Sequence, residues 1–261
     1  MFMKLEVLLS VMNLDKNQLD NMNITTKCTV INQCGENNFS SYNNFSIYSS
    51  NEIGLSNSRN LGIEKITSDI ILLCDDDVVY NDFYEQIILD EFNKHKDADV
   101  IIFNMYSPNR NNKIVKKNKK LHRYNTRGYA SQSIAFKKNS ILKKRIVFNT
   151  LFGAGAIYTS GEDTLFISDC LKKKLNVYCC DKYIGTVNHT NSTWFNGYNR
   201  KYFFDKGAVY TAMNYRFRKL LMKLYLHRHK EVLDKLTFKE AYECMKRGSM
   251  DYLRRTFRRK Y

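Results

Sequence analysis

The chain of 261 residues has one proline, one tryptophan and no run of 18 consecutive apolar residues. So little proline in a chain that is 43% hydrophobic excludes collagen-like and disordered classes. The lack of a long apolar run predicts that no helix spans a membrane. The N-terminal segment MFMKLEVLLSVMN is not expected to be a secretory signal, because Glu6 interrupts its apolar run and no small-residue cleavage site follows. The length suffices for one substantial core, with or without a helical appendage.

The cysteine pattern does not indicate a set of disulfide bonds. The seven cysteines show no CxxC spacing, and an odd number cannot pair completely. A small disulfide-stapled fold is therefore excluded, and a reducing cytoplasm is the simplest setting for the protein.

Acidic residues are missing from residues 100–161, a stretch that carries 13 Lys and Arg. The whole chain has 42 basic and 26 acidic residues, a formal net charge of +16. A second basic stretch, residues 214–261, has 15 basic and five acidic residues, so the rest of the chain is mildly acidic. Two basic surfaces on an acidic body favour a polyanionic partner or an anionic membrane surface.

Short apolar runs alternate with helical patterns over the first hundred residues. Strands are expected at 7–12, 28–31, 45–49, 69–74 and 99–104, and helices at 56–66, with Ser56 as N-cap, and at 82–94. This alternation indicates an α/β fold with a mostly parallel sheet flanked by helices. Ligands of such a sheet bind beyond the carboxyl ends of its strands.

The second half of the chain is less regular. A long basic loop is expected at 109–127, short strands at 131–137, 145–149 and 177–180, and a helix at 165–173. From about residue 202 the pattern is helical, with Phe217, Leu220, Leu221 and Leu224 on one helix face. Thr237 and Glu240 form a capping-box pattern, and Gly248 is expected to stop the last helix.

Asp75, Asp76 and Asp77 directly follow the strand expected at 69–74. Three adjacent acids contribute nothing to packing and repel one another. Their carboxylate oxygens suit a hard divalent cation that also takes phosphate oxygens as ligands. An acidic loop facing water is the other explanation, which the position after the fourth parallel strand makes the weaker one.

Glu162 and Asp163 lie at the start of the later helix. Acids at a helix N-terminus can simply complement the helix dipole. However, these two end the stretch of 62 residues without an acid, and a carboxylate in a cleft is a natural general base. Both explanations stay open at this point.

Together these motifs resemble the family 2 glycosyltransferases of the GT-A fold. The resemblance spans roughly residues 4–200 in the expected order, and residues 188–208 are similar to a bacterial subgroup of surface polysaccharide biosynthesis. The motifs are Asn32-Gln33, GLSNSRN at 54–60, LCDDD at 73–77, Gly155-Ala156 and GEDTLF at 161–166. The resemblance implies a Rossmann-like nucleotide-diphospho-sugar transferase fold. It further implies metal-dependent, inverting transfer from a nucleotide-diphosphate sugar, with a UDP-sugar favoured, to a glycan or lipid-linked acceptor in capsule, lipopolysaccharide or similar assembly.

The resemblance also implies roles for the acids. Asp163 matches the catalytic base that takes the proton of the acceptor hydroxyl, and Glu162 would orient it or bind the acceptor. Asp77, with Asp75 nearer the ribose or sugar, would hold the Mn²⁺ or Mg²⁺ that bridges the donor diphosphate. Asp76 is grouped with them in donor binding.

Further donor and acceptor residues follow from the same resemblance. Arg59 matches a position near the diphosphate and the acids, and Asn32 stands where many members have an Asp that contacts the nucleobase or ribose. His189 is a candidate metal ligand or else a polar loop residue. The remaining candidates are Gly155 and Trp194 for the acceptor, with Trp194 alternatively plugging the junction to the tail, and Arg200 and Lys206 for the diphosphate.

Two domains are expected. Residues 1–205 form the glycosyltransferase domain, with nucleotide-sugar binding in about 1–104 and the acceptor and catalytic base in 105–205. Residues 206–261 form a basic amphipathic helical tail. The tail either lies on the anionic inner face of the cell membrane, each Lys or Arg contributing about 1 kcal/mol, or caps the enzyme with a solvated basic face. The first option makes the protein cytoplasmic and peripheral to the membrane.

Two other functions fit single features of the sequence. LLCDDDVV at 72–79 resembles the first motif of haloacid-dehalogenase-type phosphatases, although their nucleophile follows the first strand rather than a later one. A basic nucleic-acid-binding protein would use residues 113–127 and the tail as phosphate contacts. Because that function leaves Asp75 to Asp77 and Glu162-Asp163 without a role, no nucleic-acid partner is expected.

Overall fold

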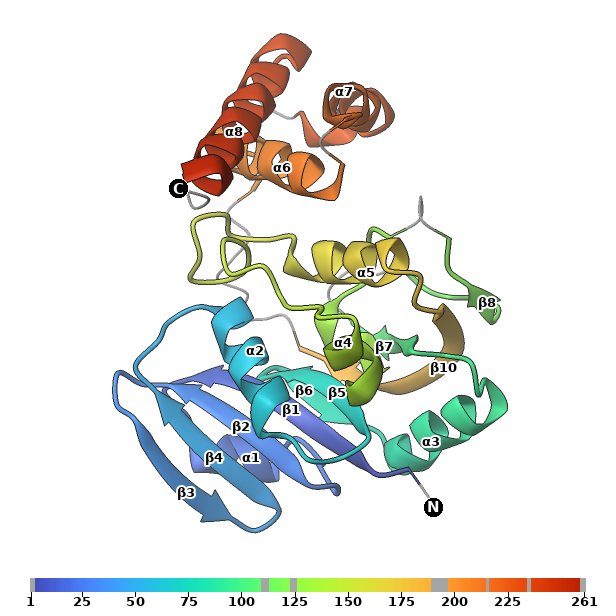
Figure 1. Cartoon of the computed structure of the whole chain (residues 1–261). Coiled ribbons are helices and arrows are strands. Elements are labelled where there is room, and N and C mark those ends of the chain that lie inside the picture. Colours follow the sequence, from blue (N-terminus) through green and yellow to red (C-terminus); the bar gives the residue numbers. More distant parts are fainter. Residues whose placement is uncertain are drawn as a thin grey trace. The chain divides into compact units, whose positions relative to one another are not determined.

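A computed structural model of the chain describes residues 3–108, 113–122, 126–188, 197–214, 216–233 and 236–258. The chain forms two compact units (Figure 1). Unit 1 comprises Met1–Thr150 and Glu162–Asn191, and unit 2 comprises Leu151–Gly161 and Ser192–Tyr261. Each unit is therefore built from two separate stretches of chain.

Unit 1 is organised around one ten-stranded sheet in the described residues. Its order is β3-β4-β2-β1-β5-β9-β7-β10-β6, with β8 paired to β10. The strands are β1 (Leu5–Met12), β2 (Cys28–Gln33), β3 (Asn38–Tyr42), β4 (Phe45–Ser50), β5 (Ile70–Asp75), β6 (Val78–Tyr80), β7 (Val100–Tyr106), β8 (Lys119–Lys120), β9 (Ile134–Lys137) and β10 (Val177–Val187). Strands β4, β2, β1 and β5 are parallel, whereas β9 runs antiparallel to both of its neighbours. A second parallel pair, β7 with β10, lies in the other half of the sheet. The expected α/β fold class is confirmed.

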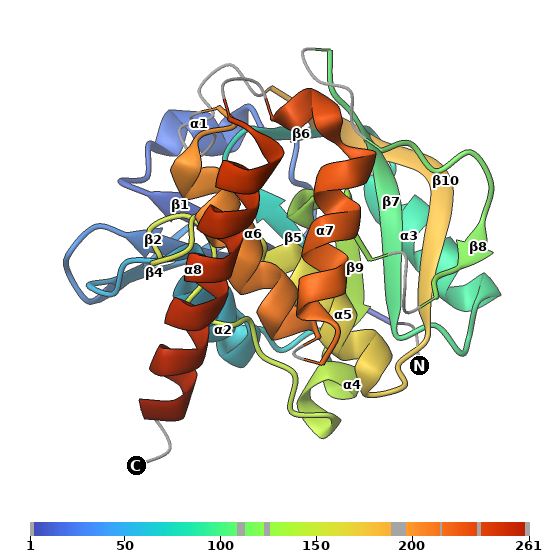
Figure 2. The same cartoon turned by 90° about the horizontal axis from the view of Figure 1, so that it is seen from above.

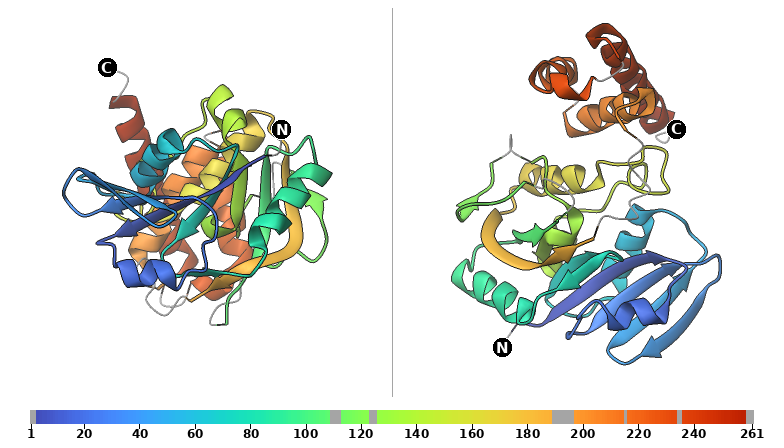
Figure 3. Two further views of the ribbon diagram at one scale, coloured as in Figure 1. Left: turned by 90° about the horizontal axis from the view of Figure 1, so that it is seen from below. Right: turned by 180° about the vertical axis from the view of Figure 1, so that it is seen from behind.

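Helices cover both faces of this sheet because alternate strand residues point to opposite sides. The helices are α1 (Lys16–Asp20), α2 (Leu55–Lys65), α3 (Tyr84–Lys94), α4 (Lys138–Lys143) and α5 (Glu162–Lys172). Val7 and Leu9 of β1 pack in one core cluster with residues of α1 and α3. Leu8, between them, packs in a second cluster with residues of α2, α4 and α5. Figures 1 and 3 show α1 and α2 on opposite faces of the sheet.

Three local expectations for unit 1 need correction. Helix α2 begins at Leu55 with Gly54 as its N-cap, so Ser56 lies inside the helix. Residues 145–149 form no strand; there, Phe148 exchanges two hydrogen bonds with the side chain of Asn60 instead of pairing with a strand. The strands β3 and β6 were not expected, because each is short and follows or precedes a turn.

Unit 2 is helical. It contains α6 (Arg200–Met213), α7 (Arg218–Arg228), the 3₁₀ helix η3 (Lys230–Val232) and α8 (Phe238–Arg258). Figure 2 shows α6, α7 and α8 side by side, and their apolar faces share one core cluster. No helix in the described residues is long and apolar enough to cross a membrane.

Helices α6 and α8 approach closely where both carry glycine. A Cβ on Gly207 would lie 1.9 Å from the carbonyl oxygen of Met245, and one on Gly248 would lie 1.8 Å from the carbonyl oxygen of Phe204. Gly248 therefore does not stop a helix as expected, since α8 continues through it to Arg258. The capping box at the start of α8 is confirmed, because the Thr237 hydroxyl accepts from the Glu240 amide and Glu240 accepts from the Thr237 amide.

The segment Leu151–Gly161 belongs to this helical unit. The Tyr158 hydroxyl donates to Asp251 of α8 at 2.8 Å, and the Thr159 amide and hydroxyl both donate to Asp205 of α6. Residue 205, the expected end of the glycosyltransferase domain, thus falls inside α6 and is bonded to this segment.

Candidate active site

Asp75 lies where a buried strand ends at the carboxyl edge of the parallel strands. Residues 70–74 of β5 are all buried and apolar, and Asp75 is the first partly exposed position. The register pairs Asp75 with Ser10 of β1, and the next β1 residue, Val11, pairs with Asn32 of β2. Asp75 and Asn32 therefore flank β1 at the edge where such folds bind ligands.

Arg59 is the centre of the site. Its side chain is 1% exposed, and one of its terminal nitrogens, Nη2, donates to Asp75 Oδ1 at 2.9 Å. The other, Nη1, lies 3.1 Å from Asp163 Oδ1 and 3.5 Å from Glu162 Oε1. A single buried guanidinium thus joins the acid at the end of β5 to both acids in the first turn of α5. Its charge-assisted, forked geometry is the reason an arginine can hold carboxylates from two elements at once.

The cluster holds more negative than positive charge. Burial opposes the charge of Arg59, but the carboxylates, Asp75 foremost, more than offset this and raise its pKa above the ordinary value. Burial and the neighbouring Glu162 raise the pKa of Asp163 well above its usual range, with Arg59 opposing the rise. A carboxyl group with a raised pKa, placed in a cluster of this kind, has the properties of a general base.

Phe148 and Asn60 complete the setting of Arg59. The guanidinium carbon lies 5.4 Å from the centre of the Phe148 ring. Asn60, the next residue on α2, donates to the Phe148 carbonyl and accepts from its amide at 2.9 and 2.8 Å. Arg59 therefore binds the acids, and the adjacent Asn60 fixes Phe148 beside the guanidinium. Periodicity could not reveal Phe148, because it lies 88 residues from Asn60.

Ser131 is a site residue that the sequence did not indicate. It begins the 3₁₀ helix η1 (Ser131–Ser133), and its hydroxyl donates to Asp75 Oδ2 at 3.0 Å. Asp75 is thus held through both carboxylate oxygens, by Arg59 on one and Ser131 on the other. Ser131 lies in the acid-free stretch without any motif around it, so only the tertiary fold reveals this contact.

Asn32 and its neighbour Gln33 organise the edge beside Asp75. The side-chain oxygen of Asn32, Oδ1, accepts from the Leu14 backbone amide at 3.0 Å, just after β1. Gln33 accepts from the Gly54 amide at 2.7 Å, which fixes the start of α2. Gly54 has φ 124°, a conformation that favours glycine, so this residue type is required at the turn that leads to Arg59.

Asp76 and Asp77 continue the edge from Asp75 into β6. The Asp76 carbonyl accepts from the Gln18 side chain at 2.6 Å, and the Asp77 carbonyl accepts from the Asn188 amide at 2.9 Å. The chain position just before His189 therefore lies next to Asp77. His189 itself is outside the described residues. Within those residues, no three His, Cys, Asp or Glu side chains form a metal-binding group.

The remaining candidates are Gly155, Arg200, Lys206 and Trp194. No contact in the described residues links any of them to Arg59 or to the acids around it. Gly155 lies in unit 2, with φ 77°. Arg200, at the start of α6, donates to Glu240 of α8 at 2.9 Å, and the Lys206 amine lies 5.3 Å from the Tyr202 ring centre. Trp194 lies outside the described residues.

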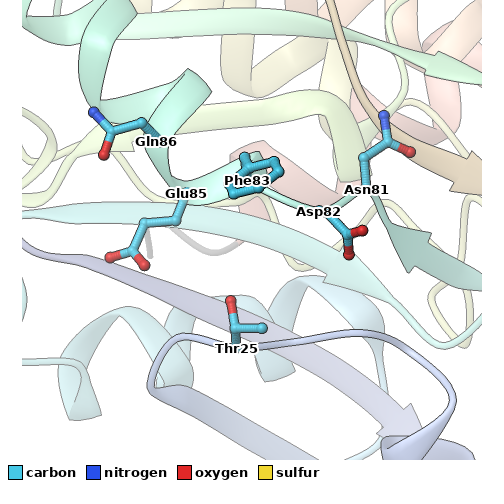
Figure 4. A pocket seen from close by; sticks show the side chains of 6 residues that line it. All are labelled: Thr25, Asn81, Asp82, Phe83, Glu85 and Gln86. Atoms are coloured by element: carbon cyan, nitrogen blue, oxygen red, sulfur yellow. The ribbon is translucent and has the colours of Figure 1, made fainter.

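A separate cavity of about 430 Å³ lies in unit 1 at the junction of β6 and α3. Figure 4 shows its lining residues: Thr25, Asn81, Asp82, Phe83, Glu85 and Gln86. Thr25 precedes β2, so the cavity lies toward the amino ends of the parallel strands, opposite the edge that carries Asp75. None of the candidate site residues named above lines it.

Comparison with known families finds a match for part of the chain. The family model described as "Glycosyl transferase family 2" matches residues 36–160. Residues 36–160 belong to glycosyl transferase family 2. The matched range contains Arg59, Asp75 and Ser131, and it ends just before Glu162 and Asp163. The expected family is confirmed, and the match gives no support to the phosphatase alternative. No curated protein sequence matches the chain at a significant level.

Solved structures show the same fold. Among the similar ones is the crystal structure of residues 1–349 of TarS from S. aureus, with 14% identity and a TM-score of 0.59. The same TarS segment in complex with UDP-GlcNAc has 16% identity and a TM-score of 0.62, and in complex with UDP 15% and 0.59. In each case the similarity covers 87% of this chain and 72% of the TarS segment. At this level of identity the comparison establishes the fold.

Proposed function

We propose that this family 2 protein is an inverting glycosyltransferase that uses a nucleotide-diphosphate sugar. The observation that carries the proposal is the bridge made by Arg59 between Asp75 at the strand edge and Asp163 in the first turn of α5. The bridge links Asp75, at the edge where the donor would bind, with Asp163, which would remove the proton of the acceptor hydroxyl. The Asp163 side chain is partly exposed and its pKa is raised. An ion pair that served only to stabilise the fold would need neither property.

Asp163 is the base of the proposed reaction. The acceptor hydroxyl loses its proton to an Asp163 oxygen while the hydroxyl oxygen forms a bond to the anomeric carbon. The bond from that carbon to the diphosphate breaks, and its electron pair leaves with the nucleoside diphosphate. Attack from the side opposite the leaving group inverts the anomeric centre. Glu162 keeps Asp163 basic through its charge, and Arg59 fixes the orientation of Asp163.

A divalent cation fits the residues at the end of β5. The side chains there are carboxylates, the oxygen ligands that Mg²⁺ and Mn²⁺ take. Asp77 would hold the ion, with the donor diphosphate completing its ligands, while Asp75 stays engaged with Arg59 and Ser131. When bound, the ion neutralises charge on the diphosphate leaving group.

The finer parts of the proposal concern the donor, the acceptor and the location. A UDP-sugar is favoured, because TarS, which shares the fold, was solved with UDP-GlcNAc and with UDP. The acceptor is a glycan or lipid-linked glycan of capsule, lipopolysaccharide or another surface polysaccharide. The seven cysteines, all free, support a cytoplasmic enzyme, which would work at the inner face of the cell membrane.

Calorimetric titration tests the donor site. Wild type is titrated with UDP, GDP, CDP and dTDP, each with and without Mg²⁺ or Mn²⁺. We expect one nucleotide, UDP, to bind with a requirement for metal, and Asp77→Asn to weaken that binding at least tenfold. Asp82→Asn is the matched control, because Asp82 lies five residues downstream and lines the separate cavity. Absence of binding by every nucleotide, in folded protein, would refute the proposal.

A further inference from the structure

Helix α7 exposes an apolar stripe. Phe217, which caps the helix, Leu220 and Leu224 are 55%, 54% and 40% exposed. Their spacing of three and four residues places them along one side of the helix. The other side of α7 is already used, because Met222 and Leu226 are buried in the core of unit 2. The exposed stripe is therefore additional to the residues that hold α7 in place.

The stripe lies in a segment that carries positive charge alone. Residues 206–230 contain seven Lys and Arg, two His and no Asp or Glu. Lys219 and Lys223 are exposed and alternate with the leucines of the stripe. In the described part of the chain, no salt bridge neutralises either lysine. Apolar side chains flanked by unneutralised cations suit the interface of an anionic bilayer. There, the apolar side chains meet acyl chains and the cations meet lipid phosphates.

Helix α8 is also amphipathic and basic, and part of it is engaged within unit 2. Its apolar face packs on α6 through the close approach at Gly248. Two of its cations are paired within the helix, Lys246 with Glu243 and Arg255 with Asp251. Met250 and Phe257 of α8 are exposed as well, but they lie seven residues apart, whereas the exposed apolar side chains of α7 follow one another at spacings of three and four residues. Among the described residues of unit 2, the denser exposed apolar surface is therefore on α7.

We propose that α7 docks on an anionic phospholipid surface. Phe217, Leu220 and Leu224 enter the boundary between headgroups and acyl chains, and Lys219 and Lys223 contact lipid phosphates. The inference names the membrane contact of the function proposed above. Its test uses neither donor nor acceptor, so failure of sugar transfer and failure of docking are separate results.

Co-sedimentation of the full chain with vesicles tests the docking. We expect binding to phosphatidylcholine vesicles that contain phosphatidylglycerol and little binding to pure phosphatidylcholine. The double variant Leu220→Gln/Leu224→Gln should lower partitioning about tenfold or more. Lys219→Gln/Lys223→Gln should lower it by a similar factor and reduce its sensitivity to salt.

Control variants separate docking from damage to the fold. Leu142→Gln/Val147→Gln changes two apolar side chains of unit 1 that are 47% and 62% exposed, and it should bind vesicles like wild type. Both α7 variants should keep the wild-type thermal unfolding transition, because the replaced side chains lie outside the core of unit 2.

Three results overturn the proposal. One is vesicle binding that is unchanged in both α7 variants. Another is binding to an oligonucleotide but not to vesicles, lost in the lysine variant and kept in the leucine variant, which assigns the surface to nucleic acid. The third is a dimer in sedimentation velocity that dissociates in the leucine variant without any vesicle binding, which assigns the stripe to a second copy of the chain.

Discussion

Arg59 and Asp163 face each other at 3.1 Å, from helices that lie about a hundred residues apart in the chain. The guanidinium is buried and also holds Asp75, so the acid at the strand edge and the proposed base in α5 cannot shift independently. The position of the reacting groups relative to one another therefore depends on one side chain.

Replacing Arg59 by methionine should destabilise the protein by about 3–5 kcal/mol, because carboxylates in a largely enclosed cluster lose their only described cation. Urea unfolding of wild type and variant measures the difference. The difference should shrink as the pH falls, since protonated carboxyls no longer repel one another. Arg200→Met, which removes an exposed cation, is the control and should change stability little. A difference independent of pH contradicts the electrostatic explanation.

Asp163→Asn should lower kcat by about 10²–10⁴-fold, the usual contribution of a general base. Donor affinity should stay at the wild-type value, because the amide keeps the shape of the side chain and the donor contacts lie elsewhere. Steady-state kinetics with a UDP-sugar and calorimetry with UDP give the two quantities. Full activity in this variant would exclude Asp163 as the base.

The pH dependence of kcat/KM should show the raised pKa of Asp163. Below that pKa the base is protonated, so the rate falls as the pH drops, and the fall should begin at a higher pH than for an ordinary aspartate. Glu162→Gln removes a negative charge that raises the pKa, so the acid limb should move to lower pH. A limb that stays in place in this variant means that Glu162 does not act on the base.

Ser131→Ala should weaken donor binding about fivefold, because loss of the hydrogen bond to Asp75 costs about 1 kcal/mol. Ser133→Ala is the matched control: it is equally buried on the same turn, but its hydroxyl donates to the backbone carbonyl of Ala130. Isothermal titration with UDP and metal compares the two. Equal losses in both variants indicate a general effect of the turn rather than an effect through Asp75.

Gly248→Ala should destabilise unit 2 by about 1–3 kcal/mol, because the added methyl group meets the Phe204 carbonyl oxygen across the helix contact. Met250→Ala, two residues further on an exposed part of α8, should change stability by less than about 0.5 kcal/mol. Chemical unfolding followed by far-ultraviolet circular dichroism measures both. Gly248→Ala with wild-type stability contradicts a tight α6–α8 contact.

Local patterns were sufficient to predict the elements that carry the site. The apolar run before Asp75 predicts its strand, and the N-cap expected at Ser56, although two residues late, predicts the helix of Arg59. Both are short-range signals, because each depends on a few consecutive residues.

The missed features depend on residues far apart in the chain. Strand β6 is three residues long and exists because Val78 pairs with Val187. Ser131 reaches Asp75 over 56 residues, with no pattern of its own. The sequence alone predicts a helix end at Gly248, because it does not reveal that a neighbouring helix occupies the space where a side chain would lie. Such contacts follow from packing, which the sequence specifies only through the whole fold.

Unit 2 cannot be removed as an appendage, because the chain enters it twice. A protein truncated after residue 205 would keep the segment Leu151–Gly161 but lose Asp251, the partner of Tyr158, and Val209, which packs beside Gly161. That segment runs directly into Glu162 and Asp163. Deleting the C-terminal helices therefore releases one end of the turn that carries the proposed base. A shortened protein without activity would then carry no information about membrane binding or about the acceptor.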